Sequence, residues 1–166
     1  EHSIEFQAVM LAHVFDPDIA IVPILCGPFT QDIAQEDAPL DRLDPFLAAV
    51  NTLVSDPADG VTVIAGADLA HVGKRFGDAF DITDAVVQRV AARDDEDMQH
   101  AASVQPEAFY RSVMRDRNER KVCGLGCIYA MLKAVEGHAA AGELLCYGYS
   151  PDPIGGIVSY ASMVLA

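Results

Sequence analysis

The thiol of Cys123, within the sequence RKVCGLGC at 120–127, could carry out the widest range of chemistry in this chain. A glycine follows it, and the apolar residues after it recur at helical spacing, so we expect Cys123 where a loop becomes a helix. Unpaired backbone N–H groups at a helix start favour a thiolate, and Arg120 and Lys121 would act in the same direction. Such a thiolate could serve as a nucleophile or as a metal ligand.

A second candidate group, Asp68 and His71, follows an apolar run at 61–66 that is typical of a buried strand. Ligands of open α/β sheets bind beyond the carboxyl ends of strands, so we expect both side chains at such an edge. An aspartate three residues before a histidine can orient the imidazole, which then acts as acid, base or ligand. A surface histidine without a role is an equally open interpretation.

The other histidines give weaker signals. His2 lies between Glu1 and Glu5 at a predicted helix start, which composition alone favours as a capping arrangement with an exposed imidazole. His13, His100 and His138 fall on or beside polar helix faces. The sequence has no Gly-rich phosphate loop, G-x-S-x-G elbow or HExxH motif, so activated-serine and P-loop chemistry have no support.

Four cysteines could in principle form two disulfides, but no secretory signal is recognisable, so we expect free thiols and a cytoplasmic protein. Cys26 and Cys146 lie in apolar, strand-like runs and are predicted to be small core residues. Cys123 and Cys127 share a helical face. A lone C-x3-C lacks the second ligand pair of a structural zinc site.

The net charge of −14, from 25 acidic and 11 basic residues, argues against nucleic-acid and anionic-membrane surfaces. No apolar run approaches the roughly 18 residues of a membrane span. Five basic residues are concentrated within 111–121. They could steer an anionic substrate toward Cys123, but a solvated face at a helix end is the favoured interpretation.

The alternation of apolar patterns predicts one layered α/β domain over 1–166, with helices on both faces of a mainly parallel or mixed central sheet. Helical spacing covers 3–14, 40–54, 82–102, 106–118 and the residues after Cys123. Strand-like runs cover 19–26, 61–66, 143–149 and 158–165, of which the first two are continuous apolar runs expected to be buried on both faces.

Five motifs in order resemble those of the Memo-like proteins, also named AmmeMemoRadiSam system protein B. They are EHSIEFQ at 1–7, IVPILCG at 21–27, ADLAHVGKRF at 67–76, VCG at 122–124 and VSYA at 158–161. Because the motifs extend over nearly the whole chain, the resemblance is specific.

The resemblance implies an α/β/α sandwich shared with class III extradiol dioxygenases, which hold non-haem iron with two histidines and a glutamate. In Memo-like proteins a cysteine takes the place of that glutamate, and Cys123 matches it. His71 matches the pocket histidine that acts as acid/base in the dioxygenases and is a further candidate ligand, with Asp68 beside it. His2 falls in a motif near the pocket. Iron is the expected metal, although a thiolate also suits copper or zinc.

The resemblance also implies that this chain corresponds to the C-terminal portion of the family domain, because it begins at the EHSIE motif. Both ligand histidines of the family would then lie in the preceding half. Apolar sheet edges would be exposed, so we expect a homo-oligomer or association with the missing N-terminal half.

Four functional hypotheses follow. The first is a Memo-like metal-binding protein with a redox or oxygen-linked role and an unknown small-molecule or peptide ligand. The second is an extradiol ring-cleaving dioxygenase, and the third is a non-enzymatic peptide- or protein-binding module with a vestigial pocket. The fourth is nucleophilic chemistry by Cys123 with His71 as its base, which needs the two side chains about 3–4 Å apart.

Overall fold

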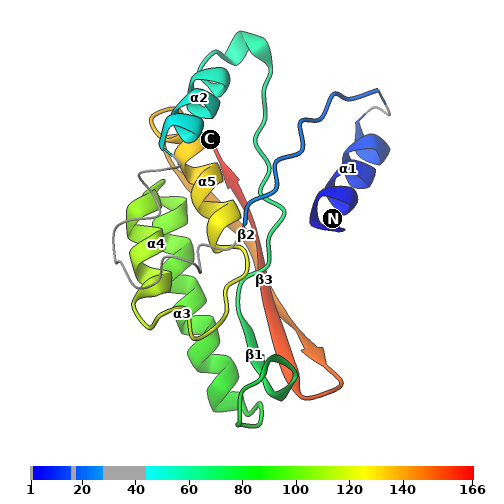
Figure 1. Ribbon diagram of the computed structural model, residues 1–166, viewed down its shortest axis with the longest axis vertical. Coiled ribbons are helices and arrows are strands. Elements are labelled where there is room, and N and C mark those ends of the chain that lie inside the picture. Colours follow the sequence, from blue (N-terminus) through cyan, green and yellow to red (C-terminus); the bar gives the residue numbers. More distant parts are fainter. Residues whose placement is uncertain (1, 16–17, 28–43) are drawn as a thin grey trace.

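The computed structural model describes residues 2–15, 18–27 and 44–166 (Figure 1). Residues 1, 16–17 and 28–43, the last of which include the predicted helix start at 40–43, lie outside the described residues. The helices are α1 (His2–Val14), α2 (Asp44–Val54), α3 (Asp84–Ala102), α4 (Pro106–Met114) and α5 (Leu125–Val135), with short 3-10 turns η2 (Pro57–Asp59) and η3 (Lys74–Phe76). The strands are β1 (His71–Gly73), β2 (Gly142–Asp152) and β3 (Gly156–Leu165). The predicted α/β class is confirmed.

The three strands form one sheet in the order β1-β3-β2, and both pairings are antiparallel. β2 and β3 form a hairpin whose turn uses Gly155 at φ 89°, a backbone conformation that glycine adopts without steric cost. The short β1 pairs with the start of β3, so that His71 lies opposite Val158. Parallel pairing, expected from the alternation of helices and strands, does not occur among the described strands, because the two longest are joined by a tight turn.

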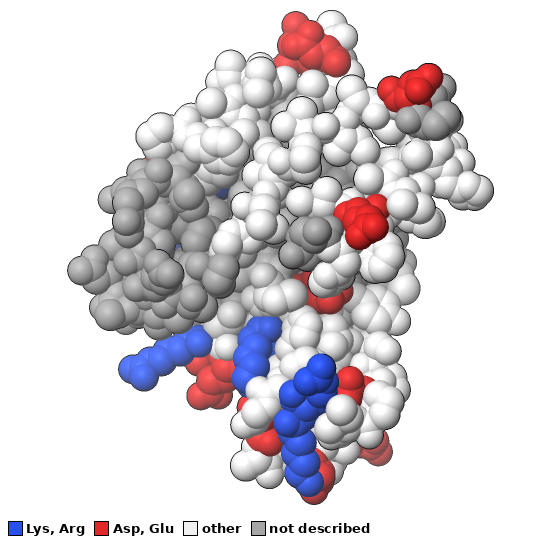
Figure 2. Space-filling model, turned by 45° about the vertical axis from the view of Figure 1, so that its right-hand side comes forward, with Lys and Arg blue, Asp and Glu red and all other residues white. Residues whose placement is uncertain are grey.

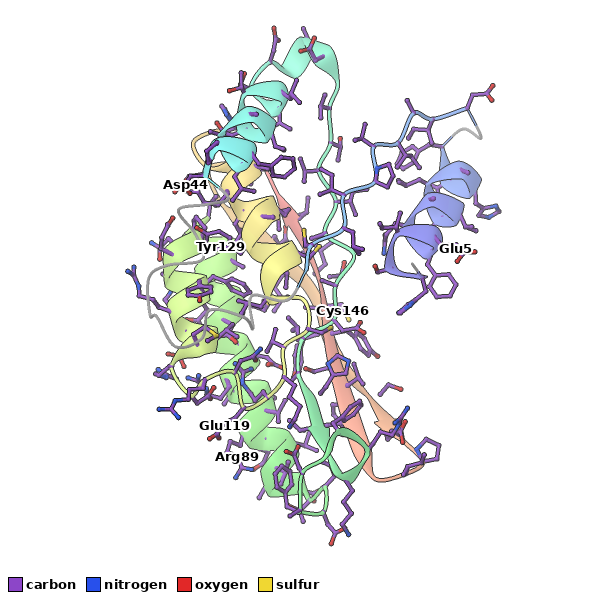
Figure 3. All side chains as sticks on the ribbon, viewed as in Figure 1. Glu5, Asp44, Arg89, Glu119, Tyr129 and Cys146 are labelled. Carbon is purple, nitrogen blue, oxygen red and sulfur yellow. The ribbon has the colours of Figure 1, made fainter. Side chains whose placement is uncertain are left out.

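Figure 1 shows α2, α3, α4 and α5 on one side of the sheet and α1 on the other. The main core lies between the sheet and the four helices, and it includes Phe109, Val113, Tyr129 and Leu132, each almost fully buried. Tyr129 lies between α5 and α4, with its ring edge-on to that of Tyr110 at 6.0 Å between centroids (Figure 3). These buried positions recur at helical spacing, which is why the helices were predictable from sequence.

The predicted helix 106–118 ends earlier, at Met114, for a local reason. Arg117 and Asn118 adopt left-handed backbone angles, with φ of 58° and 55°, which a helix cannot contain. The Asn118 side chain stabilises this turn by accepting a hydrogen bond from the backbone N–H of Val122 at 2.8 Å. The turn directs the chain from α4 toward Cys123.

The two runs predicted as doubly buried strands, 19–26 and 61–66, are extended but belong to no strand of the described sheet. Their side chains are largely exposed, and Val22 reaches 84%. These side chains are exposed because a segment is buried on both faces only between two flanking layers. The described residues supply a layer on one side at most.

Two further expectations about cysteines are also wrong. Cys146, labelled in Figure 3, is exposed on β2, and Cys26 is only half-buried. Neither is a core residue. Among the described residues, no helix is long and apolar enough to cross a membrane.

Candidate metal centre

Asp68, His71 and Cys123 form a compact group of potential metal ligands. One ligand atom from each lies within 4.8 Å of the other two. The His71 Nε2 and an Asp68 carboxylate oxygen are 4.0 Å apart. The structure therefore brings together two segments of chain that the sequence analysis had identified separately.

Backbone hydrogen bonds on both sides fix the segment that carries Asp68 and His71. The N–H of Leu69 donates to the Ser159 carbonyl at 2.9 Å, and the N–H of Ala70 donates to the Ser159 hydroxyl at 2.9 Å. On the other side the N–H of His71 donates to the Arg120 carbonyl at 2.7 Å. Leu69 and Ala70 are themselves buried. Asp68 and His71 thus project from a backbone with little freedom to move.

Cys123 is held against the same segment by the residue that follows it. The N–H of Gly124 donates to the Asp68 carbonyl at 3.0 Å, and the Cys123 thiol contacts that carbonyl at 3.8 Å. A Cβ at Gly124 would lie only 2.5 Å from the Asp68 carbonyl oxygen and 2.7 Å from the Ala67 Cβ. Glycine is therefore required here by the close approach of two backbones rather than by an unusual φ.

The His71 ring has a defined orientation and tautomer. Its Nδ1 lies 3.2 Å from the Leu69 carbonyl oxygen, which can only accept a hydrogen bond, so this contact requires the proton on Nδ1. Nε2 then carries the free lone pair on the side of Asp68. The Phe76 ring contacts the imidazole edge-on at 5.1 Å. A histidine whose second nitrogen donates to a carbonyl is the usual arrangement of a metal-binding imidazole.

The expected thiolate at Cys123 is not what the surroundings favour. Partial burial of its sulfur raises the pKa of Cys123 although the residue as a whole is exposed, and the Asp68 carboxylate raises it further. The two cations expected to oppose this are engaged elsewhere: Arg120 pairs with Asp94 and Asp97, and Lys121 pairs with Asp78 at 2.7 Å. The neutral thiol is therefore the favoured form in the absence of a cation, and a bound metal ion is the kind of charge that would reverse this.

A sequence profile of the family described as Memo-like protein matches residues 1–164. The chain belongs to the Memo-like protein family. Among its curated relatives, a MEMO1 family protein of Aquifex aeolicus is 26% identical over 99% of this chain and 40% of its own length. A MEMO1 family protein of Methanococcoides burtonii is 29% identical over 99% of this chain and 55% of its own length. The chain thus spans about half the length of the curated relatives it matches.

Membership of the Memo-like family confirms the resemblance found in the motifs, and the structure shows how two of those motifs meet. The ADLAHVGKRF motif supplies Asp68 and His71, and the VCG motif supplies Cys123 with the glycine that lets it approach. His2 lies outside this three-residue group. It occupies the exposed start of α1, with its ring edge-on to Phe6 at 6.2 Å.

The donor set of this Memo-like site fits a transition metal. It offers one imidazole nitrogen, one sulfur and one carboxylate oxygen, a mixture that suits iron or zinc, whereas a second soft ligand would favour copper(I) more strongly. Asp68 was not predicted as a ligand, because its expected role was to orient the imidazole of His71. The D-x-x-H spacing was the signal that could have suggested it.

The sequence analysis also missed a buried polar network behind the site. Asp94 and Asp97 of α3 both pair with Arg120, and Asp94 accepts hydrogen bonds from the hydroxyls of Ser159 at 2.6 Å and Tyr147 at 2.9 Å. Burial raises the pKa of the Asp94 carboxyl, while the hydrogen bond from Ser159 and the charge of Arg120 oppose that effect. Ser159 and Arg120 are the residues that hold the backbone of 69–71, so this network supports the candidate ligands.

The cluster of basic residues at 111–121 was predicted to be a solvated face at a helix end, and Arg120 departs from this prediction because it is buried. Arg115 pairs with Glu96 at 2.7 Å, and Arg120 is buried beneath the surface. Figure 2 shows the Lys and Arg side chains of one face gathered at one end, with acidic side chains beside them. Most of this positive charge is therefore neutralised locally.

Proposed function

We propose that this Memo-like protein binds a transition-metal ion through His71, Cys123 and Asp68 and has a redox or oxygen-linked role. The observation that carries the proposal is the convergence of three different ligand atoms within 4.8 Å. The orientation of His71, with its Nδ1 held by the Leu69 carbonyl, supports it further. Non-haem iron is the metal we propose, and copper or zinc are the alternatives.

The roles of the residues follow from their chemistry. His71 would hold the ion through Nε2, Cys123 through its sulfur after losing its proton, and Asp68 through a carboxylate oxygen. A bound iron ion supplies one-electron chemistry and Lewis acidity. Asp68 is the more exposed of the pair with His71, at 53% against 19%, so it is the side chain best placed to meet a small-molecule or peptide ligand.

Metal binding is tested with the anaerobically purified chain and with Co²⁺ as a spectroscopic probe. We expect a sulfur-to-cobalt charge-transfer band that disappears in Cys123→Ala and shifts in His71→Ala, and Fe²⁺ affinity on the order of 100-fold weaker in both. Cys146→Ala and His138→Ala are the matched controls and should bind as the parent does. Equal metal binding by the parent and Cys123→Ala would refute the proposal.

Ring cleavage of a catechol is one specific reaction that the proposed oxygen-linked role could include. It predicts iron-dependent oxygen uptake when a catechol is added, with loss of uptake in His71→Ala. Metal binding without such oxygen uptake would support the metal site but contradict the dioxygenase assignment.

A second candidate function is favoured by a separate observation. α1, the residue Phe15 directly after it and the segment 18–27 expose large apolar side chains, among them Phe6 and Leu25. A surface of this kind suits a peptide or protein partner. Partner binding that survives Cys123→Ala, together with the absence of copurified metal, would favour this non-enzymatic role.

The site gives less support to nucleophilic chemistry. The Cys123 thiol contacts a backbone carbonyl, and burial and Asp68 both raise its pKa. All four cysteines are free, which agrees with the reducing compartment, the cytoplasm, that we propose for the protein.

A further inference from the structure

Two of the three candidate ligands, Asp68 and His71, are three positions apart in the chain and yet reach the same site. In a regular strand successive side chains point to opposite faces of the sheet, so residues three apart face opposite sides. The two residues between them, Leu69 and Ala70, are exposed by only 3% and 0%, although in a regular strand they too would face opposite sides. The backbone therefore departs from regular strand geometry between Asp68 and His71.

The backbone hydrogen bonds of Ser159 show what this departure is. Ser159 belongs to β3, which lies beside β1 (Figure 1). Its carbonyl accepts from the N–H of Leu69 at 2.9 Å, and its N–H donates to the carbonyl of Ala70 at 3.0 Å. One residue of β3 thus opposes two residues of the segment that leads into β1, which is the pattern of a β-bulge. The extra residue turns Leu69 and Ala70 together toward the core and leaves Asp68 and His71 together on the other side.

The Ser159 side chain satisfies the extra N–H of this bulge. Among the described residues, the acceptor for the Ala70 N–H is the Ser159 hydroxyl oxygen, at 2.9 Å. Both residues are 0% exposed, so water does not reach the N–H to replace this acceptor. A buried N–H without a partner carries the full penalty of its lost hydration. The hydroxyl of Ser159 therefore helps to hold the bulge in place.

Asp94 fixes the direction of that hydroxyl. The Ser159 O–H donates to an Asp94 carboxylate oxygen at 2.6 Å, and the Tyr147 hydroxyl donates to the same oxygen at 2.9 Å. Asp94 is also the ion-pair partner of the buried Arg120, and an ionised carboxylate can only accept hydrogen bonds. The hydroxyl proton is thus directed at Asp94, which leaves an oxygen lone pair for the N–H of Ala70.

A single peptide group links Ser159 to His71. The carbonyl of Leu69 and the N–H of Ala70 belong to the same planar unit. Its N–H donates to the Ser159 hydroxyl at 2.9 Å, and its carbonyl oxygen lies 3.2 Å from the His71 Nδ1. Because rotation of the plane would disturb both contacts, the serine that holds the N–H also fixes the carbonyl that orients the imidazole.

We propose that Ser159 is a positioning residue of the candidate metal centre, since its hydroxyl holds the bulge that places Asp68 and His71 on one side of the sheet and orients the His71 ring. This inference rests on the proposed metal-binding function. Ser159 itself contacts no metal, and it acts through the peptide group between Leu69 and Ala70.

Ser112 supplies a matched control, because it is a second buried serine in the same polar network. Its hydroxyl donates to an Asp97 carboxylate oxygen at 2.5 Å, and Asp97 pairs with Arg120. Ser112→Ala therefore removes one buried hydrogen bond, as Ser159→Ala does, but leaves the peptide group beside His71 untouched. The two variants should lower the midpoint of urea denaturation to a similar extent.

The first measurement uses the whole 166-residue chain without metal. Heteronuclear NMR of the histidine ring nitrogens, assigned with His71→Gln, reports which nitrogen carries the proton in the neutral imidazole. We expect the Nδ1-protonated form of His71 in the parent and in Ser112→Ala, and a mixture of both tautomers in Ser159→Ala. A ring spectrum of His71 that is the same in the parent and in Ser159→Ala would overturn the proposal.

The second measurement is a Co²⁺ titration of the same three chains. Ser159→Ala should bind roughly 10- to 100-fold more weakly and with a shifted absorption spectrum, as is usual when the support of a histidine ligand is removed. Ser112→Ala should match the parent in both, and parent-like Co²⁺ binding by Ser159→Ala would overturn the proposal. If the parent binds no Co²⁺, the proposed metal function fails, and the tautomer measurement still decides whether Ser159 positions His71.

A third measurement needs only the parent chain, in case Ser159→Ala does not fold. The Ala70 amide should exchange with deuterium as slowly as the most protected amides of α5, because its acceptor is buried. Fast exchange of this amide, or an Nε2-protonated His71 in the parent, would overturn the proposal without any variant.

Discussion

At the scale of single residues, the chemistry of this chain depends on which neighbour each sulfur meets. Burial and the Asp68 carboxylate raise the pKa of the Cys123 thiol, whereas a hydrogen bond from Cys127 lowers the pKa of Cys26 to about 7. Proximity to a helix start and to basic residues in the sequence was therefore a poor guide to the ionisation of Cys123. The basic neighbours of Cys123 form ion pairs instead, Lys121 with Asp78 and Arg120 with Asp94 and Asp97.

The ionisation of Cys26 gives a prediction of pH dependence. A thiolate is the reactive form, so the iodoacetamide alkylation rate of Cys26 should rise with pH and reach half its maximum near pH 7. Cys127→Ala removes the hydrogen-bond donor, which should move this midpoint to higher pH and slow the reaction at pH 7. Rates are measured by peptide mass spectrometry with Cys146 in the same chain as the internal control. An unchanged midpoint in Cys127→Ala would contradict the effect of Cys127 on the pKa of Cys26.

Gly124 gives a second prediction at this scale. Gly124→Ala places a methyl group against the Asp68 carbonyl and Ala67, so the two backbones must separate. We expect about 1–3 kcal/mol lower stability, as for other overpacked sites, together with weaker metal binding. Gly27→Ala is the matched control, since a Cβ there meets nothing within 4 Å. Urea denaturation and Fe²⁺ titration measure both effects, and equal stability of the two variants would contradict the packing argument.

At the scale of elements, the candidate ligands depend on a charge network between α3, the turn before Cys123, and the sheet. Arg120→Met would leave Asp94 and Asp97 buried without their cation, so we expect a loss of about 3–5 kcal/mol in the free energy of unfolding. Arg115→Met removes an exposed pair with Glu96 and should cost less than about 1 kcal/mol. Urea denaturation of both variants measures the difference. Similar losses in the two would show that the buried network contributes no more than a surface ion pair.

The same elements show what could be predicted from sequence. α3 and α5 were predictable because their apolar positions repeat locally, and the D-x-x-H and C-G motifs contain the three residues whose possible ligand atoms lie within 4.8 Å of one another. The partners of Arg120 were not predictable, since Asp94 and Asp97 are brought to it by the packing of α3 and carry no local signal of burial other than sharing a face with Val90 and Met98. The runs 19–26 and 61–66 were predicted as doubly buried strands, but in the described structure they belong to no strand and are largely exposed. Burial of an apolar run depends on layers packed against both of its faces, which the run itself does not encode.

At the scale of the whole molecule, the distribution of apolar side chains is uneven. The helices α3, α4 and α5 bury theirs. By contrast, Phe15 directly after α1 is 72% exposed, and in the segment 18–27 Val22 is 84% and Leu25 70% exposed. Figure 2 shows that much of one face carries few charged side chains. Exposed apolar surface of this extent is unusual for a monomeric protein. The relatives are about twice as long as this chain.

We therefore predict that the 166-residue chain self-associates through the segment 18–27, with a second copy covering its apolar side chains. Burial of this surface is the driving force, so association should strengthen with ammonium sulfate and weaken in urea. The double variant Val22→Asp/Leu25→Asp should sediment as a monomer at concentrations where the parent forms dimers or larger species. Ile154→Asp changes an equally exposed side chain, at 68%, in the β2–β3 turn and is the matched control. A parent chain that sediments as a monomer at high concentration would show that this face has no affinity for itself, and the peptide- or protein-binding role of the same face would then be the one left to test.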